Sequence, residues 1–349
     1  MTRVLQAMAG AVFGGAEAFF VRLVLALHRA GVSQHVIIRA HTRRAAILEA
    51  RGLSPVELPF GGPFDVKSRL RFRREIARFQ PDVVLTWMNR ATQLCPRGSF
   101  IHVGRLGGYY DLKFYRHCDH LIGNTHDIVD YIVQQGWPRE RAHYLPNFVN
   151  EERCPPLKRM TYYTPDSAPL ILALGRLHKN KGFHTLLKAM TGIPEVYLWV
   201  AGAGPQHAEL EALATHLAVK PRVRFLGWQD DVAPLFAAAD LFVCTSRHEP
   251  LGNVILEAWA QGLPVVATAS AGPAALIRNE ENGLLTPVDE APALALAIRR
   301  VLLDDTLRQR LTVGGRLSFE ATFTETAVVA HYRTFFNRIT SSCVASAEQ

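Results

Sequence analysis

The stretch Glu249-Pro-Leu-Gly-Asn-Val-Ile-Leu-Glu257, which continues as Ala-Trp-Ala-Gln-Gly262-Leu-Pro-Val-Val-Ala-Thr268, decides the fold and the chemistry of the second half of this chain. Pro250 cannot lie inside a helix, because it lacks an amide hydrogen and its ring clashes with the preceding turn. Glu249 is therefore expected in a loop. Apolar residues then recur at helical spacing, so we predict a helix from about residue 253 to residue 261, ended by Gly262.

Two carboxylates fall near the start of this predicted helix. Glu249 precedes it, and Glu257 lies one turn inside it, with a side chain that tilts back toward the amino terminus. Free amides at a helix start attract phosphate, and carboxylates accept hydrogen bonds from sugar hydroxyls. The segment therefore indicates a site for a phosphorylated, hydroxyl-rich ligand. The alternative is a dipole-stabilising glutamate beside a solvated loop glutamate.

Length and composition fit two packed domains. The chain has 349 residues, of which 48% are hydrophobic, and this is ample for two cores. Mean hydropathy is +0.04 and no apolar run is long enough to span a bilayer, so we expect a soluble protein. The start of the chain has no signal-type pattern, which favours the cytoplasm. The five cysteines are scattered, so neither a disulfide framework nor a zinc site is predicted.

The charge balance is basic and favours anionic partners. The net charge is +8, which suits nucleotides, phosphorylated glycolipids, a membrane surface or nucleic acid. Residues 65–79 carry six basic residues among apolar ones. A basic amphipathic helix of this kind suits an anionic membrane surface, and an ordinary crossover helix with a solvated arginine face is the alternative. No recognised nucleic-acid-binding motif is present, so no nucleic-acid partner is expected.

Short apolar runs alternate with amphipathic segments, which is typical of parallel sheets with crossover helices. In the first half the strand candidates are Val4-Leu5, Val36-Ile37-Ile38, Val83-Val84-Leu85, Phe100-Ile101-His102-Val103 and Leu121-Ile122. In the second half they are Leu170 to Leu174, Val196 to Val200, Val223 to Leu226, Leu241 to Cys244 and Val265 to Ala267. The pattern predicts an α/β fold.

A stretch rich in proline and polar groups interrupts the alternation near the middle of the chain. We place the domain boundary there. The first domain is expected over residues 1–155, a linker over 156–168 and a second, similar domain over 169–322, with a cleft between the domains. Ligands of open α/β sheets bind beyond the carboxyl ends of the strands, so the loops at those ends are the candidate sites.

One such loop follows Leu174 and carries two cations. Arg176 and Lys181 precede a predicted helix, and both are suitable phosphate ligands. Each good charged contact contributes about 1.5–3 kcal/mol.

Two glycine-rich turns are further candidates. Gly202 and Gly204 follow a strand and permit close approach to the backbone, although such glycines also serve simply as turn formers. Gly14 and Gly15 open a helix near the amino terminus, which offers a second amide-rich helix end. This amino-terminal turn does not read G-x-G-x-x-G, so a dinucleotide oxidoreductase loses support.

Taken together, these motifs resemble the retaining glycosyltransferases of family four, which have the two-domain fold called GT-B. The resemblance covers nearly the whole chain and rests on Gly14-Gly15-Ala16-Glu17, Asn124-Thr125, Leu145-Pro146-Asn147-Phe148-Val149, Gly175-Arg176 with Lys181-Gly182, Gly202-Ala203-Gly204-Pro205, Phe225-Leu226-Gly227 and Glu249 through Thr268. It implies two Rossmann-like domains with parallel sheets facing across a cleft, the first on the acceptor side and the second binding the donor. It also implies a C-terminal helix over 323–340 that crosses back to the first domain.

The resemblance implies a role for each motif residue. Arg176 and Lys181 would neutralise a nucleotide diphosphate, and Glu249 would contact the transferred sugar; these three are the expected catalytic residues. Glu257 would hold the ribose hydroxyls. The expected donor-binding residues are Gly14, Gly15, Gly202, Gly204, Leu251, Gly252, Asn253 and Glu257.

The implied chemistry is sugar transfer with retention at the anomeric carbon. Negative charge grows on the departing diphosphate, and Arg176, Lys181 and helix amides would stabilise it. The sequence contains no D-x-D and already supplies two cations, so we expect no metal and no cofactor besides the nucleotide-diphosphate sugar as co-substrate.

The chain departs from the family pattern in the loop over residues 104–113. Many relatives carry a histidine there, and this loop has none, so no catalytic histidine is carried over. Arg105, Tyr109 and Asp111 could contact acceptor or donor instead, although aromatics packed on the loop glycines are the alternative. His102 lies in a predicted strand and is expected to be structural.

We therefore expect a retaining, metal-independent glycosyltransferase, a hexosyltransferase, that extends lipopolysaccharide core or another envelope polysaccharide. Its expected partners are a nucleotide-diphosphate sugar, a glycan or lipid-linked glycan acceptor, and an anionic membrane surface that meets residues 65–79. It would be cytoplasmic, with a peripheral place on the inner face of the cytoplasmic membrane. The alternatives are a transferase with a soluble sugar or glucan acceptor and a non-catalytic nucleotide-sugar-binding protein.

Overall fold

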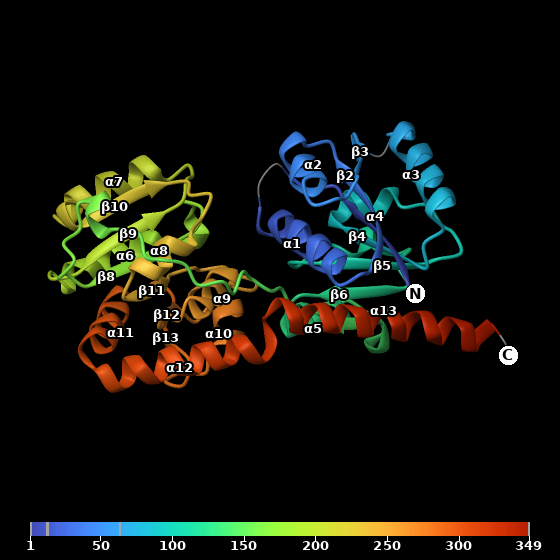
Figure 1. The fold of residues 1–349 in the computed structure, drawn as a ribbon. Coiled ribbons are helices and arrows are strands. Elements are labelled where there is room, and N and C mark those ends of the chain that lie inside the picture. Colours follow the sequence, from blue (N-terminus) through green and yellow to red (C-terminus); the bar gives the residue numbers. More distant parts are fainter. Residues whose placement is uncertain (1, 12–13, 63, 348–349) are drawn as a thin grey trace. The chain divides into compact units, whose positions relative to one another are not determined.

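The computed structural model describes residues 2–11, 14–62 and 64–347, and the chain divides into two compact units (Figure 1). The first unit is Met1–Asn147 with Glu325–Gln349, and the second is Phe148–Thr324. Each unit holds one sheet in which all strand pairs are parallel. The predicted fold class, two α/β units with parallel sheets, is confirmed.

The first sheet has the strand order β3-β2-β1-β4-β5-β6-β7. Its strands are β1 (Arg3–Met8), β2 (Ser33–Arg39), β3 (Val56–Leu58), β4 (Val83–Trp87), β5 (Ile101–Leu106), β6 (His120–Gly123) and β7 (Ala142–Tyr144). The helices of this unit are α1 (Gly15–Arg29), α2 (Thr42–Glu49), α3 (Val66–Phe79), α4 (Met88–Leu94), α5 (His126–Gln134) and α13 (Glu325–Ala347). The central strands β1, β4 and β5 are almost wholly buried, as expected for a parallel sheet with helices on its faces.

The second sheet has the strand order β10-β9-β8-β11-β12-β13. Its strands are β8 (Leu170–Leu174), β9 (Tyr197–Ala201), β10 (Val223–Gly227), β11 (Leu241–Cys244), β12 (Val265–Thr268) and β13 (Leu284–Thr286). The helices are α6 (Phe183–Ala189), α7 (His207–His216), α8 (Ala233–Ala238), α9 (Asn253–Ala260), α10 (Ala271–Leu276), α11 (Ala291–Leu303) and α12 (Asp305–Thr322).

Alternate side chains of the second sheet enter two separate cores. Ile171 and Ala173 of β8 join the cluster that includes residues of α6 and α11, whereas Leu170 and Leu172 join the cluster that includes residues of α8 and α9. Because successive side chains of a strand point to opposite faces, this partition means that helices cover both faces of the sheet. The strand ends and their loops are then the parts of the sheet left for ligands.

The predicted linker over residues 156–168 is wrong. The division between the units falls between Asn147 and Phe148, and the following segment packs on the second unit. Val149 is 1% exposed within the core there, and Thr164 accepts a hydrogen bond from the buried indole of Trp199 at 2.9 Å. The proline-rich composition is typical of a linker, but the segment from Phe148 to residue 168 packs against the second unit and is part of it.

Arg105 was expected in an open loop, and the structure corrects this. It lies in β5 and is 3% exposed, with its guanidinium 4.7 Å from the ring of Phe19 and 4.4 Å from that of Trp87. Its Nε donates to the hydroxyl of Tyr332 in α13 at 2.9 Å, and its Nη2 donates to Asn147. Arg105 is thus a structural residue that holds the last helix on the first unit.

Replacing Arg105 with leucine should destabilise the first unit by about 3 kcal/mol, because a charged hydrogen-bond donor and a stacked cation are both lost from a buried place. Urea unfolding of the purified protein measures this. Arg139→Leu is the matched control: its bond to Asp130 at 3.3 Å is exposed and should matter little. Equal losses in the two variants would contradict the structural role of Arg105.

Candidate functional site

Three loops of the second unit meet at the carboxyl ends of neighbouring strands. The loops follow β8, β9 and β11, and β8 lies between the other two in the sheet. They carry most of the residues singled out from the sequence. The structure therefore brings together in one unit Arg176, Lys181, Gly202, Gly204, Glu249, Leu251, Gly252, Asn253 and Glu257. Gly14, Gly15, Arg105, Tyr109 and Asp111 belong to the other unit.

One glycine joins the β8 loop to the β11 loop. Gly182 has a φ of 63°, in the left-handed region, and a Cβ added to it would lie 2.1 Å from the carbonyl oxygen of Thr245. No other residue type fits without a shift of this backbone. The Thr245 hydroxyl donates to the carbonyl of Lys181 at 2.8 Å. The amide of Arg247 donates to the carbonyl of Asn180 at 2.7 Å. The two loops are thus fixed against each other by their main chains.

This junction brings Lys181 and Glu249 into contact. Lys181 Nζ donates to Glu249 Oε2 in a short ion pair, and the two side chains are only 23% and 14% exposed. The Ser246 hydroxyl donates to the same oxygen at 3.1 Å. Burial by itself lowers the pKa of Lys181, but the charge and hydrogen bond of Glu249 outweigh it and the pKa is raised overall. Lys181 is therefore a protonated, positioned cation at neutral pH.

Residues at and after the end of β12 hold the loop that carries Glu249. Thr268, fully buried at the end of β12, donates its hydroxyl to the carbonyl of Ser246 at 2.7 Å. The amide of Gly272 donates to the carbonyl of Glu249 at 2.7 Å, and a Cβ on Gly272 would lie 2.5 Å from that oxygen. The loop that carries Glu249 is thus held by β12 and α10. The residues from Gly262 to Gly272 that follow α9 thus help to position the loop that carries Glu249.

Arg176 differs from Lys181 in being available. It is exposed and makes no hydrogen bond or ion pair within the described part of the chain. It follows Gly175, whose amide donates to the carbonyl of Ala201, the last residue of β9, at 3.0 Å. Of the two predicted phosphate cations, one is thus held by a carboxylate and the other extends into solvent from the same loop.

The glycines of the β9 loop serve the protein's own packing. A Cβ on Gly202 would lie 2.0 Å from the carbonyl oxygen of Gly175, and one on Gly204 would lie 2.4 Å from that of Leu177. The sequence suggested that these glycines admit a ligand. The space beside their Cα atoms is instead taken by the backbone of the β8 loop, so a donor-binding role for Gly202 and Gly204 stays a prediction.

The predicted helix with two carboxylates near its start is confirmed. Helix α9 begins at Asn253, after Gly252 in a left-handed conformation with a φ of 88°, and Gln261 is its C-cap. Leu251 is 5% exposed, and Glu257 is half-buried one turn inside the helix. The loop glutamate and the helix glutamate therefore belong to one continuous motif, which spans the start of α9.

In the first unit, Gly15 begins α1 and Gly14 precedes it. Glu17 is 7% exposed and folds back, accepting a hydrogen bond from the amide of Ala11 at 2.7 Å. The carbonyl of Ala11 in turn accepts from Arg44 at 2.8 Å. This pair of contacts was not foreseen from the sequence, because it joins Glu17 and Arg44 through the main chain of Ala11.

Tyr109 and Asp111 have local partners in the first unit. The Tyr109 hydroxyl donates to Asp127, and burial together with this hydrogen bond raises the pKa of Tyr109 to about 12. Asp111 accepts from the amide of Lys113 at 3.0 Å and caps the short 3-10 helix Leu112–Phe114. Both side chains remain exposed at the surface, so contact with a substrate stays a prediction for them.

His102 is structural, as expected. It is 4% exposed and lies 3.0 Å from the hydroxyl of Thr86. Burial lowers its pKa to about 4, so the ring is neutral in the core.

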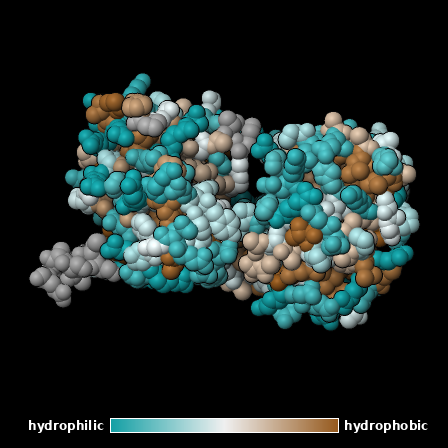
Figure 2. Space-filling view, turned by 180° about the vertical axis from the view of Figure 1, so that it is seen from behind, coloured by the Kyte–Doolittle hydropathy of each residue, from teal (hydrophilic) through white to brown (hydrophobic). Residues whose placement is uncertain are grey.

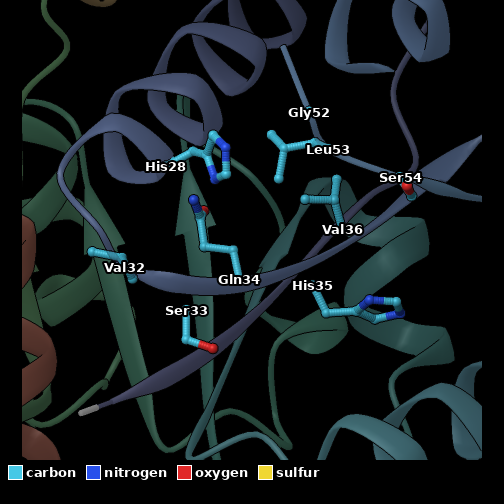
Figure 3. Close-up of a pocket in the computed structure, with 9 residues that line it drawn as sticks. All are labelled: His28, Val32, Ser33, Gln34, His35, Val36, Gly52, Leu53 and Ser54. Carbon is cyan, nitrogen blue, oxygen red and sulfur yellow. The ribbon is translucent and has the colours of Figure 1, made fainter. Parts of the chain in front are cut away.

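The first unit contains a hollow of about 350 Å³ (Figure 3). Its walls come from the end of α1, the first residues of β2 and the turn before β3, including His28, Gln34 and His35. These are the amino ends of the strands, whereas ligands of such sheets bind at the carboxyl ends. Within the described ranges, no group of three His, Cys, Asp or Glu side chains is placed to hold a metal ion.

Replacing Gly182 with alanine should separate the two loops. We expect a loss of about 3 kcal/mol in the free energy of unfolding, from left-handed strain and a clash with the backbone of Thr245. Gly31→Ala is the control: its φ is 75° but nothing lies within 4 Å of an added Cβ, so only about 1 kcal/mol of strain is expected. Urea unfolding of both variants measures the difference, and equal losses would contradict the junction described here.

Comparison with known proteins covers both units. Residues 13–153 match the family described as Glycosyltransferase Family 4, and residues 159–317 match that described as Glycosyl transferases group 1. The chain is 40% identical over 333 residues to the lipopolysaccharide core biosynthesis glycosyltransferase LpsE of Rhizobium meliloti (strain 1021), across 91% of this chain and 94% of that protein. It is 36% identical over 329 residues to LpsD of the same organism, across 93% and 95%.

A solved structure has the same fold. The Anabaena protein Alr3699/HepE, in complex with UDP and glucose, superimposes with a TM-score of 0.82 at 20% identity, over 95% of this chain and 99% of that one.

Proposed function

Because this chain belongs to the glycosyltransferases of family four and group 1, we propose that its second unit binds a nucleotide-diphosphate sugar and transfers the sugar to an acceptor of lipopolysaccharide core biosynthesis. Glycosyltransferase activity and the GT-B fold come with the family. The donor class is supported by the Anabaena structure, which holds UDP and glucose on the same fold. The acceptor class is supported by the names of LpsE and LpsD.

The observation that carries the donor site is the ion pair between Lys181 and Glu249. It places a protonated cation and a carboxylate at the carboxyl ends of β8 and β11, beside the start of α9. A diphosphate offers oxygens that can replace Glu249 as the partner of Lys181. Glu249 is then free to accept hydrogen bonds from the hydroxyls of the sugar. When Lys181 exchanges Glu249 for the diphosphate, Lys181 would thus bind the diphosphate and Glu249 would bind the sugar of the donor.

We propose that Arg176 completes the phosphate site. Its exposed guanidinium lies on the same loop as Lys181 and can form a bidentate contact with phosphate oxygens. Glu257, one turn inside α9, is proposed to hold the ribose hydroxyls. The main-chain amides of Leu251, Gly252 and Asn253 would support the sugar and phosphate.

The proposed reaction retains the configuration of the anomeric carbon and needs no metal. As the bond from that carbon to the diphosphate breaks, negative charge grows on the leaving oxygen, and Arg176, Lys181 and the amides before α9 stabilise it. Lys181 is held near this place by Glu249 before the donor binds, whereas Arg176 would be ordered by the phosphate itself. We propose that the two cations do the work that a divalent ion does in other transferases.

The proposed place of action is the cytoplasmic side of the membrane, as a peripheral protein. This is supported by the lipopolysaccharide relatives, because a core acceptor is anchored in a membrane by its lipid. Among the described residues, no helix is long and apolar enough to cross a bilayer.

Purified protein incubated with UDP, GDP, ADP and dTDP sugars should release nucleotide from one donor, and release should persist in EDTA. A membrane extract that contains lipopolysaccharide core serves as acceptor, and the anomeric configuration of the product reports retention. Release that stops in EDTA and returns with a divalent ion would contradict metal independence. Tight binding of one nucleotide without transfer to any acceptor would favour a binding protein.

Variants separate the proposed roles. Lys181→Ala should lower kcat by about 10²–10³, as for loss of a transition-state charge stabiliser. Glu257→Ala should weaken nucleotide binding by about 10–100-fold, from loss of charged hydrogen bonds to ribose. Lys179→Ala is the control, since this exposed lysine lies in the same short helix, Lys179–Lys181, and has no proposed role. Nucleotide titration and steady-state rates give both quantities, and unchanged values for Lys181→Ala and Glu257→Ala would overturn the site.

A further inference from the structure

We propose that helix α3, with Phe64 just before it, docks this enzyme on a membrane that contains anionic lipids. The surface is called the α3 ridge and consists of Phe64, Val66 and Leu70 with the cations beside them. The inference deepens the proposed function, since it gives a protein with a lipid-linked acceptor its contact with the bilayer. Binding to lipid needs neither donor nor acceptor, so it can be tested separately from transfer.

One face of α3 anchors it to the first unit. Ser68, Phe72 and Glu75 are buried, and the ring of Phe72 packs edge-on against Phe60 with centroids 6.5 Å apart. Asp65 caps the helix by accepting from the amide of Ser68 at 2.9 Å. The helix is therefore folded and oriented before any partner is met, and its opposite face is fixed.

The opposite face carries an apolar ridge. Phe64, Val66 and Leu70 are 96%, 62% and 52% exposed. At about 100° per residue, Val66 and Leu70 point away from the side of the helix that buries Phe72 and Glu75. Contiguous exposed apolar surface can mark a site of interaction with a protein or a membrane. Figure 2 shows brown atoms bordered by teal ones over this end of the first unit.

Cations lie on both sides of the ridge. By the same helical geometry, Arg69 and Arg73 fall on one flank, and Lys67, Arg74 and Arg78 fall on the other; all five are exposed. Within the described part of the chain, none of the five forms an ion pair. The sixth cation, Arg71, pairs with Glu75 at 2.8 Å.

The two acidic residues of this segment, Asp65 and Glu75, offset only part of the charge of its six cations. The Asp65 carboxylate is occupied by the amides of Ser68 and Gly61, the latter at 2.7 Å. Glu75 is 3% exposed and is paired with Arg71 and, at 3.1 Å, with His35. The outward side of the described residues 64–79 is therefore apolar along its middle and positive along both edges.

This arrangement matches an anionic bilayer better than other partners. An interfacial helix buries its apolar side chains at the boundary of headgroups and acyl chains, while flanking lysines and arginines meet the phosphates. A nucleic-acid duplex would use the cations but leave the exposed Phe64 side chain without an apolar partner. The ridge and its two charged flanks together are complementary to lipid.

Co-sedimentation with vesicles tests the proposal. The full chain should bind vesicles of phosphatidylcholine with 30% phosphatidylglycerol and bind pure phosphatidylcholine at least about tenfold more weakly, because each cation near an anionic surface adds to the affinity. Raising the salt concentration should weaken binding, and random duplex DNA should compete poorly. Equal binding to both vesicles, or preference for DNA over vesicles, would overturn the proposal.

Two variants address the ridge and its flanks. Arg73→Glu with Arg74→Glu should lower vesicle affinity by about thirtyfold or more. Phe64→Ser with Leu70→Ser should lower it while leaving the charge unchanged. The matched control is Arg299→Glu with Arg333→Glu, which changes the net charge equally at two exposed helical positions elsewhere. An equal loss in the control would mean that total charge alone governs binding and would overturn the assignment to α3.

Transfer to a detergent-solubilised acceptor separates this inference from the proposed function. The Arg73→Glu, Arg74→Glu variant should retain normal transfer in detergent, which also shows that it is folded, and lose rate only when the acceptor is in vesicles. If the wild-type chain binds vesicles but transfers no sugar, the proposed function fails and the docking surface stands. If it transfers sugar but binds no vesicles, the docking surface fails alone.

Discussion

The candidate site depends on one steric constraint, the contact between Gly182 and the carbonyl of Thr245. Two parallel strands set their carboxyl ends side by side, but they do not by themselves decide how the following loops meet. The absent side chain at Gly182 lets two main chains approach, and the hydroxyl of Thr245 fixes their register. A flexible lysine and a loop glutamate then become a defined pair. The chemistry of the site therefore rests on main-chain geometry as much as on charged groups.

Much of the fold could be predicted from the sequence, because its long strands are continuous apolar runs between clear breakers. The strands that escaped prediction, β3, β7 and β13, have three residues each, and such short segments carry no period. Helix α9 could be predicted because Pro250 and Gly262 bound it on either side. The proline-rich segment after Asn147 was predicted as a linker, because composition indicates backbone preference only. It does not reveal the buried hydrogen bond between Trp199 and Thr164.

The candidate site was predictable in its residues and less so in its connections. Arg176, Lys181 and Glu249 could be named from their motifs, but the pairing of Lys181 with Glu249 joins residues 68 positions apart and follows only from the sheet order. The glycines of the β9 loop were assigned to ligand binding, although they pack against the protein's own backbone. A glycine marks a close approach but does not tell what approaches, and at Gly202 it is the carbonyl of Gly175. Arg105 misled for a related reason, since sequence shows a cation near a loop and hides the two rings that enclose it.

The order of the two units along the chain has a consequence for synthesis. The second unit is one uninterrupted stretch, Phe148–Thr324, whereas the first is made of two pieces that lie on either side of it. On the ribosome, the second unit is complete before the last helix emerges, so it can fold while the first still lacks α13. Until Tyr332 arrives, Arg105 has no hydroxyl to bond, and the first unit is the last to close although its sequence comes first. The first unit of the nascent chain is therefore completed only when the C-terminal helix α13 has been synthesised.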